Sequence, residues 1–156
     1  EPTGSRKLAL LRKYAVLSPV TRNGRIVYRE NPFTGSVSTG DLLLVRLTVA
    51  GAADWRYLMI EDPIPAGTEP VERDSLYELE KRPNWFWGSQ RELRDDRVVF
   101  FEQELLGGRA EFSYMLKVTT PGQFNAMPAR VAPMYVPDVS ASSEVVPVTV
   151  SAEALR

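Results

Sequence analysis

The chain has 156 residues, of which 44% are hydrophobic and 25% are charged, so its composition is that of a folded domain and not of a disordered chain or a membrane span. Its 19 basic and 20 acidic side chains leave a net charge of −1, which gives no general attraction for nucleic acid or an anionic membrane. Histidine and cysteine are both absent, which excludes thiol nucleophiles and the usual zinc, iron–sulfur and haem ligands. We therefore expect no cofactor, no metal, no nucleic-acid partner and no insertion of this domain into a membrane.

The first part of the chain contains strand-length apolar runs separated by turn residues. Residues 1–5 are small and polar and include Pro2 and Gly4, which indicates a linker or a cloning remnant, and residues 6–156 are expected to form a single domain. Strands are predicted over residues 8–17, 25–28, 41–49 and 56–60. In residues 41–49, every second residue from Leu43 to Val49 is apolar, which predicts one buried face.

The middle of the chain departs from this pattern. Residues 74–81 have the composition of a short helix, with Ser75 and Glu78 at capping-box spacing. Residues 82–90 are irregular and predict a long loop that carries Trp85, Phe86 and Trp87. The chain is expected to hold at most one short helix.

Strand signals return in the last third of the chain. Apolar residues 98–101 and the alternating residues 109–118 flank Gly107 and Gly108, which predicts an antiparallel hairpin with one face of residues 109–118 in solvent. Further strands are predicted over residues 124–132 and 145–150. About eight strands suffice for two sheets, so the fold class is an all-β antiparallel sandwich.

Acidic residues occur in pairs that could serve hydrolysis or bind calcium, and each pair also has a structural explanation. The pairs are Glu61 with Asp62, Asp95 with Asp96, and Glu102 with Glu104. Asp62 precedes a proline at a strand end, the two aspartates lie between arginines, and the two glutamates are expected to share one strand face. The chain also lacks a phosphate loop, a nucleophile elbow and a dinucleotide fingerprint, so we expect no catalytic residues and no enzyme.

Two stretches could instead form binding surfaces. Trp85, Phe86 and Trp87 could stack on sugars or anchor a protein contact, or could fold onto the core. Residues 126–137 contain prolines that interrupt strand pairing, next to Met127, Met134 and Tyr135. Spacing alone does not decide whether these last side chains face outward toward another domain or inward to the core.

Four segments in order carry a resemblance to a known family. They are residues 40–47 (GDLLLVRL), 60–67 (IEDPIPAG), 92–98 (ELRDDRV) and 126–135 (AMPARVAPMY). Together they resemble the C-terminal macroglobulin-like domain of bacterial alpha-2-macroglobulins, the counterpart of the receptor-binding domain of the animal proteins. The resemblance implies an immunoglobulin-like β-sandwich at the end of a large periplasmic protein, often anchored by an N-terminal lipid, that traps proteinases.

The resemblance also implies a partner and a role. In that family a thioester made by cysteine and glutamine captures the proteinase, and the terminal domain packs on the thioester domain and keeps water and amines away. Because this chain has no cysteine, it cannot supply the thioester itself. Met134 and Tyr135 are the expected shielding residues, with Met127 as a second choice and Tyr114 as an alternative contact.

Other roles remain as alternatives. An Ig-like carbohydrate-binding or adhesive module would use the aromatic loop, and a structural spacer would use neither surface. The animal receptor-binding role is not expected, because that role relies on lysines along a helix and the candidate helix here has only Lys81.

Overall fold

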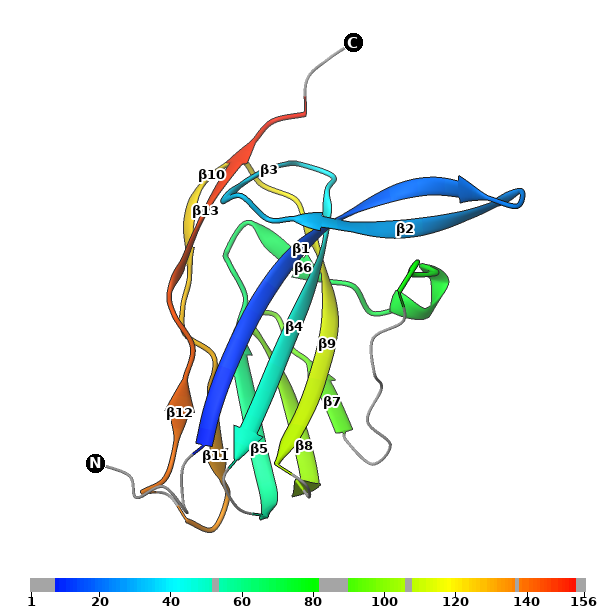
Figure 1. Cartoon of the computed structure of the whole chain (residues 1–156). Helices are drawn as coiled ribbons and strands as arrows, with labels where there is room; N and C mark the ends of the chain where they lie inside the picture. The colour runs from blue at the N-terminus through cyan, green and yellow to red at the C-terminus, as the bar shows by residue number, and fades with distance from the viewer. Residues whose placement is uncertain (1–7, 52–53, 82–89, 106–107, 137, 154–156) are drawn as a thin grey trace.

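The computed structural model describes residues 8–51, 54–81, 90–105, 108–136 and 138–153, which form a sandwich of β-sheets (Figure 1). Two five-stranded sheets face each other, and a three-stranded sheet lies along one side. Every strand pair in the described residues is antiparallel except β13 with β3. The predicted all-β sandwich is therefore confirmed.

The first five-stranded sheet is built on a long N-terminal strand. Its order is β2 (Arg25–Pro32), β1 (Leu8–Arg22), β4 (Leu42–Gly51), β9 (Arg109–Val118) and β6 (Thr68–Pro70). The first half of β1 pairs with β4 and the second half pairs with β2, so the β1–β2 hairpin extends beyond the body of the sandwich (Figure 1). Asn23 and Gly24 turn this hairpin with φ values of 52° and 77°, as a two-residue turn with left-handed backbone requires.

The other two sheets contain the remaining strands. The facing five-stranded sheet has the order β12 (Ala141–Ser142), β11 (Arg130–Pro133), β5 (Trp55–Pro63), β8 (Arg97–Leu105) and β7 (Gln90–Leu93). The three-stranded sheet has the order β10 (Gly122–Ala126), β13 (Val146–Ser151) and β3 (Ser36–Ser38). The chain passes from this side sheet to the facing sheet between β10 and β11, and it returns to the side sheet between β12 and β13.

The core lies between the two large sheets and follows from strand alternation. The inward residues of β4 (Leu43, Val45, Leu47 and Val49) are all fully buried. Phe100 of β8 and Phe112 of β9 meet across the sandwich with ring centroids 5.3 Å apart. These two strands therefore belong to opposite layers, and the predicted hairpin between them is wrong. Strand β8 pairs with β5 and β7, whereas β9 pairs with β4 and β6 in the other sheet.

The outer face of the first sheet is also partly covered. Residues 71–80, which we call the covering segment, cross it and contain a short 3₁₀ turn at Asp74–Leu76 in place of the predicted helix. The covering segment packs on a second apolar cluster around Leu17, Leu44 and Met115. Met115 is consequently 2% exposed, so the prediction that this face of residues 109–118 lies in solvent is wrong at its centre.

One further sequence prediction is corrected by the fold. Residues 124–132 were predicted as one strand, but the chain leaves β10 after Ala126 and enters β11 at Arg130, in another sheet. Pro128 lies in this break, because a proline cannot donate to a strand ladder. Among the described residues, none belongs to a helix that is both long and apolar enough to cross a bilayer.

Candidate functional site

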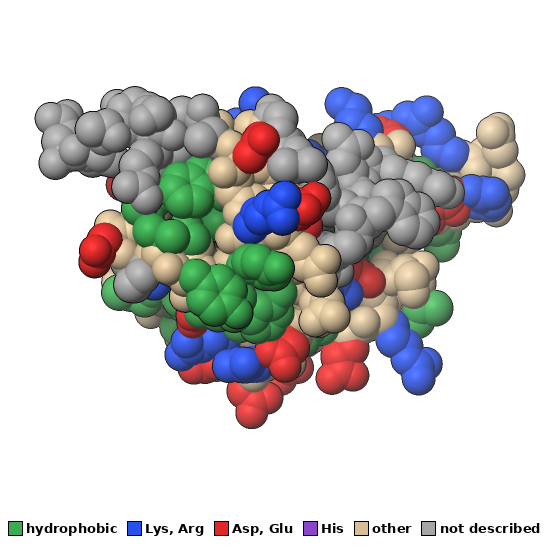
Figure 2. Space-filling model, turned by 90° about the horizontal axis from the view of Figure 1, so that it is seen from below, with side chains coloured by type: hydrophobic (Ala, Val, Ile, Leu, Met, Phe, Trp, Pro, Cys, Tyr) green, Lys and Arg blue, Asp and Glu red, His purple; other side chains and the backbone are tan. Residues whose placement is uncertain are grey.

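An exposed apolar patch lies at the end of the sandwich where β11 finishes. It consists of Tyr57 on β5 and of Met134 and Tyr135 directly after β11, and we call it the end patch. Their exposed fractions are 47%, 49% and 75%, which is high for such large apolar side chains. Figure 2 shows hydrophobic side chains gathered on this end of the molecule, with acidic and basic side chains beside them.

The end patch is held together by one backbone bond and one ring contact. The Met134 amide donates to the Tyr57 carbonyl oxygen over 2.8 Å, which extends the β11–β5 pairing beyond Pro133. The Tyr57 and Tyr135 rings meet edge to face, with centroids 5.5 Å apart and planes at 86°. This arrangement is favourable for aromatic pairs, so the patch has a defined shape before any partner binds.

A distorted backbone turns Tyr57 outward. Its φ is 56°, which is an outlier for a bulky residue. Trp55 and Leu58 are buried, whereas the two residues between them are exposed, so the usual alternation of strand β5 fails here. The partner strand β8 does the same, with Gln103 and Glu104 exposed between buried Glu102 and Leu105. Strained backbone of this kind is concentrated at functional sites, where the surrounding structure maintains it.

A small cavity of about 170 Å³ opens beside the end patch. Tyr57 and Met134 line it together with Gln90, Gln103 and Glu102. Glu102 is 5% exposed, and its Oε1 atom accepts a long hydrogen bond of 3.5 Å from the Glu104 amide, while its buried Oε2 atom has no hydrogen-bond partner. Burial raises the pKa of the Glu102 carboxyl, and the nearby Glu104 carboxylate acts in the same direction.

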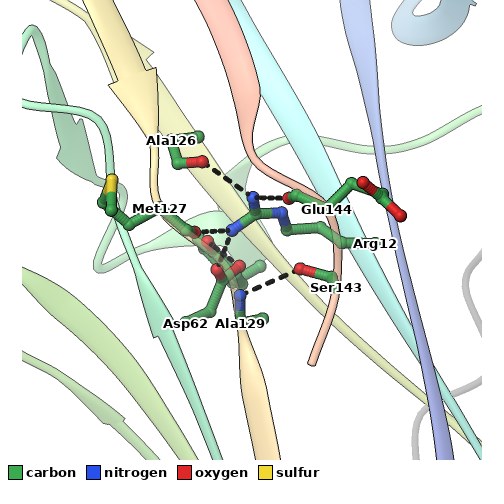
Figure 3. A network of polar contacts seen from close by, with 8 residues as sticks. Arg12, Asp62, Ala126, Met127, Ala129, Ser143 and Glu144 are labelled. Atoms are coloured by element: carbon green, nitrogen blue, oxygen red, sulfur yellow. Dashed lines mark hydrogen bonds and ion pairs between the residues drawn. The ribbon is translucent and has the colours of Figure 1, made fainter. Parts of the chain in front are cut away.

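A second polar cluster lies inside the sandwich and is centred on Arg12 of β1 (Figure 3). The guanidinium donates from Nη1 to Asp62 Oδ1 over 2.5 Å and to the Met127 carbonyl over 2.7 Å. Its Nη2 donates to the carbonyls of Ala126 and Glu144, over 3.1 and 2.9 Å. The other carboxylate oxygen of Asp62 accepts the Tyr114 hydroxyl over 2.5 Å. One side chain thus links β1 to β5 and to both crossings between the side and facing sheets.

This Arg12 cluster is structural in character. Side-chain exposure is 1% for Arg12 and 0% for Asp62, so neither reaches solvent where a substrate could bind. Burial raises the pKa of the Asp62 carboxyl, although Arg12 and the Tyr114 hydroxyl act against that rise. Burial likewise raises the pKa of Tyr114, which therefore stays a hydrogen-bond donor. The cluster satisfies backbone carbonyls that β-sheet pairing leaves free.

Comparison with known proteins decides the family. The sequence family described as "Bacterial Alpha-2-macroglobulin MG10 domain" matches residues 10–138, which is most of the chain. The chain belongs to this family. An Alpha-2-macroglobulin of Thermotoga maritima is 34% identical over 107 residues, which covers 64% of this chain and 7% of that protein. One from Xylella fastidiosa (strain 9a5c) is 32% identical over 135 residues, which covers 77% of this chain and 8% of that protein.

Solved structures agree with the MG10 assignment at the level of fold. The native conformation of Escherichia coli alpha-2-macroglobulin matches with a TM-score of 0.74 at 21% identity, over 97% of this chain and 10% of that one. A structure of native E. coli alpha-2-macroglobulin from domain MG7 to the C-terminus matches with a TM-score of 0.71 at 20% identity, over 96% of this chain and 24% of that one. The MG10 chain thus spans less than a tenth of the length of the two curated relatives above.

The MG10 fold brings two of the three predicted shielding residues together. Met134 and Tyr135 are adjacent in the end patch, whereas Met127 precedes β11 and is 54% exposed at its opposite end. Tyr114, the alternative contact, is 1% exposed and bonded to Asp62, so it offers no surface. Trp85, Phe86 and Trp87 lie outside the described residues, so the structure adds no observation for a sugar-binding loop.

The predicted acidic pairs separate into different environments. Glu61 pairs with Arg97 over 2.7 Å, while its neighbour Asp62 is buried against Arg12. Asp95 and Asp96 lie in an exposed turn. Glu102 and Glu104 do not share a face as predicted, because the distortion of β8 turns Glu104 to solvent and leaves Glu102 inside.

Sequence reasoning missed Arg12 and Tyr57. A signal for Arg12 was present, because it lies at two-residue spacing with Leu10, Tyr14 and Val16. It therefore shares their face of the strand, which is the face expected to be in the core. A charged residue at such a position indicates a buried partner. Tyr57 gave no comparable signal, since a left-handed backbone at a tyrosine is not encoded by any local residue preference.

Proposed function

We propose that this MG10 domain is a non-catalytic domain at the C-terminal end of a periplasmic alpha-2-macroglobulin that traps proteinases. In this proposal the end patch packs on the thioester domain of the same protein, shields the thioester and holds the protein in its unreacted conformation. The full-length protein would carry an N-terminal lipid anchor, and this domain would have no contact with nucleic acid.

The observation that carries the proposal is the exposure of Met134 and Tyr135 on a pre-shaped surface. Apolar side chains that cover a reactive acyl bond exclude water and amines from it. Tyrosine covers such a bond with its ring while its hydroxyl remains hydrated or bonded, and methionine fits an irregular neighbour. An interface formed by a few such side chains can separate after proteinase attack, which makes it suited to a two-state switch.

Thiol release from the full-length alpha-2-macroglobulin tests this role. We expect the wild-type protein to release thiol only after methylamine or proteinase, and the Tyr135→Ala variant to release it spontaneously, because water then reaches the thioester. Ile26→Ala is a matched control, since Ile26 is 62% exposed on the β1–β2 hairpin, away from the end patch. Equal, slow release from all three proteins would reject the shielding role, and Met127→Ala tests the second predicted residue separately.

A further inference from the structure

Glu102 is a buried carboxylate beside the end patch, and one of its two oxygen atoms lacks a hydrogen-bond partner. It is 5% exposed and its Oε2 atom has no hydrogen-bond partner. A buried, unpaired carboxylate oxygen is costly, so such a group is normally paired with a cation or bonded to a donor. Among the described residues, none supplies that cation: Arg56, the basic residue next to Tyr57, pairs with Glu104 over 3.6 Å.

The cavity beside Glu102 has the size and lining for one basic side chain. Its volume of about 170 Å³ is below the roughly 300–1,000 Å³ of pockets that hold small-molecule ligands. Tyr57 contributes an aromatic wall, which attracts cations, and Met134 can contact an aliphatic stem. The side-chain oxygens of Gln90 and Gln103 can accept hydrogen bonds from the same group.

We propose that the surface that packs on the end patch inserts one arginine or lysine side chain into this cavity, where its charge pairs with Glu102. The inference rests on the proposed function for the identity of the domain that supplies the side chain. The strained backbone at Tyr57 has a role in this arrangement, because it places the Tyr57 ring at the cavity and against Tyr135 at the same time.

Titration of the chain with propylguanidinium tests the cavity directly. By NMR at neutral pH, we expect saturable shifts of the Tyr57, Gln103 and Met134 amides, and propylurea, which has nearly the same shape and no charge, should leave them unchanged. Glu102→Gln should weaken the binding by roughly tenfold or more, because the ionic hydrogen bond is lost. Glu104→Gln is the matched control, since Glu104 is exposed on the same strand.

Equal shifts with propylurea, no shifts at all, or full binding by Glu102→Gln would each overturn the cation site. In the full-length protein, thiol release from different variants distinguishes the shielding proposal from the basic-side-chain proposal. Early thiol release in both Tyr135→Ala and Glu102→Gln, but not in Glu104→Gln, supports both. Early release in Tyr135→Ala alone leaves the shielding role in place and rejects the basic side chain, and early release in neither variant rejects both.

Discussion

Arg12 occupies a position in β1 that strand alternation assigns to the core, and the hydrogen bonds donated by its two terminal nitrogens, Nη1 and Nη2, make that position tolerable. Four of its contacts go to Asp62 and to the carbonyls of Ala126, Met127 and Glu144. Arg12→Met should destabilise the domain by about 3–5 kcal/mol, because Asp62 is then a buried charge without its cation. Urea unfolding followed by tryptophan fluorescence measures this loss.

The control and the double variant separate charge from packing. Arg94→Met removes an exposed pair with Glu92, so it should cost less than about 1 kcal/mol. Arg12→Met combined with Asp62→Leu should recover part of the loss, since neither charge then remains unpaired. A single Arg12→Met variant as stable as Arg94→Met would show that the ion pair contributes little.

Glu102 should make the stability of the domain depend on pH in a direction opposite to that of most carboxylates. The unfolded chain loses this proton near the ordinary pKa of 4.5, whereas burial raises the pKa of the folded state, which keeps the proton to higher pH. The folded state therefore binds more protons, and its stability falls as pH rises through this window. Above the raised pKa the decrease stops.

Glu102→Gln removes this titration. The melting temperature of the variant minus that of wild type should therefore grow as pH rises from 4.5 and then level off. The comparison isolates one carboxyl, because all other groups titrate in both proteins. A difference that stays constant with pH would mean that Glu102 titrates normally in the folded domain.

The covering segment, residues 71–80, illustrates stabilisation at the scale of an element without regular structure. The Tyr28 amide donates to the Glu78 carbonyl and the Glu80 amide donates to the Tyr28 carbonyl, each over 2.8 Å, which fastens the segment to β2. The rings of Tyr77 and Tyr28 meet edge to face with centroids 5.2 Å apart. The segment thus covers apolar residues that would otherwise face solvent.

Removal of the Tyr77 ring should expose part of this second cluster. We expect Tyr77→Ala to destabilise the domain by about 2–3 kcal/mol, through lost burial, and to increase binding of a hydrophobic dye. Leu76→Ala, one residue away, should change stability by less than about 0.5 kcal/mol, because Leu76 is 73% exposed. Thermal unfolding of the two variants side by side is the measurement, and equal effects would mean that the segment does not protect the cluster.

The elements that the sequence predicted well are those whose two faces differ strongly. Residues 109–118 alternate, and the structure has β9 over the same residues, Arg109–Val118. Strand partners were not predictable in the same way, because alternation reports burial and not which strand lies alongside. The mistaken hairpin between β8 and β9 and the undivided strand over residues 124–132 both follow from this limit.

The candidate site was predictable only where a proline interrupts a strand beside large apolar residues. That pattern identified Met134 and Tyr135 but left open whether they face outward. Their partner Tyr57 is 77 positions earlier in the chain than Met134, and its backbone conformation depends on the surrounding sheet. The prediction that Glu102 and Glu104 share a face failed for the same reason, since the distortion of β8 turns Glu104 to solvent and leaves Glu102 inside.

At the scale of the whole molecule, the side sheet is the part that depends most on polar contacts. It has three strands, one of which is three residues long, and both of its connections to the facing sheet are bonded to Arg12. The two large sheets share the main apolar core, to which the side sheet contributes fewer residues, among them Val148 and Val150. We therefore expect the guanidinium to couple the opening of the side sheet to the unfolding of the rest of the domain.

Arg12→Lys should weaken that connection while keeping a positive charge near Asp62. A lysine ammonium has a compact set of donors and cannot reproduce the planar fork that reaches Asp62 and the carbonyls of Ala126 and Glu144 together. Native-state hydrogen exchange should then show the amides of β10 and β13 exchanging through a local opening of lower free energy, while those of β4 and β9 still require global unfolding. Arg94→Lys, at an exposed pair, should leave both sets unchanged. If all four strands lost protection equally in Arg12→Lys, the guanidinium would stabilise the domain as a whole instead of coupling its sheets.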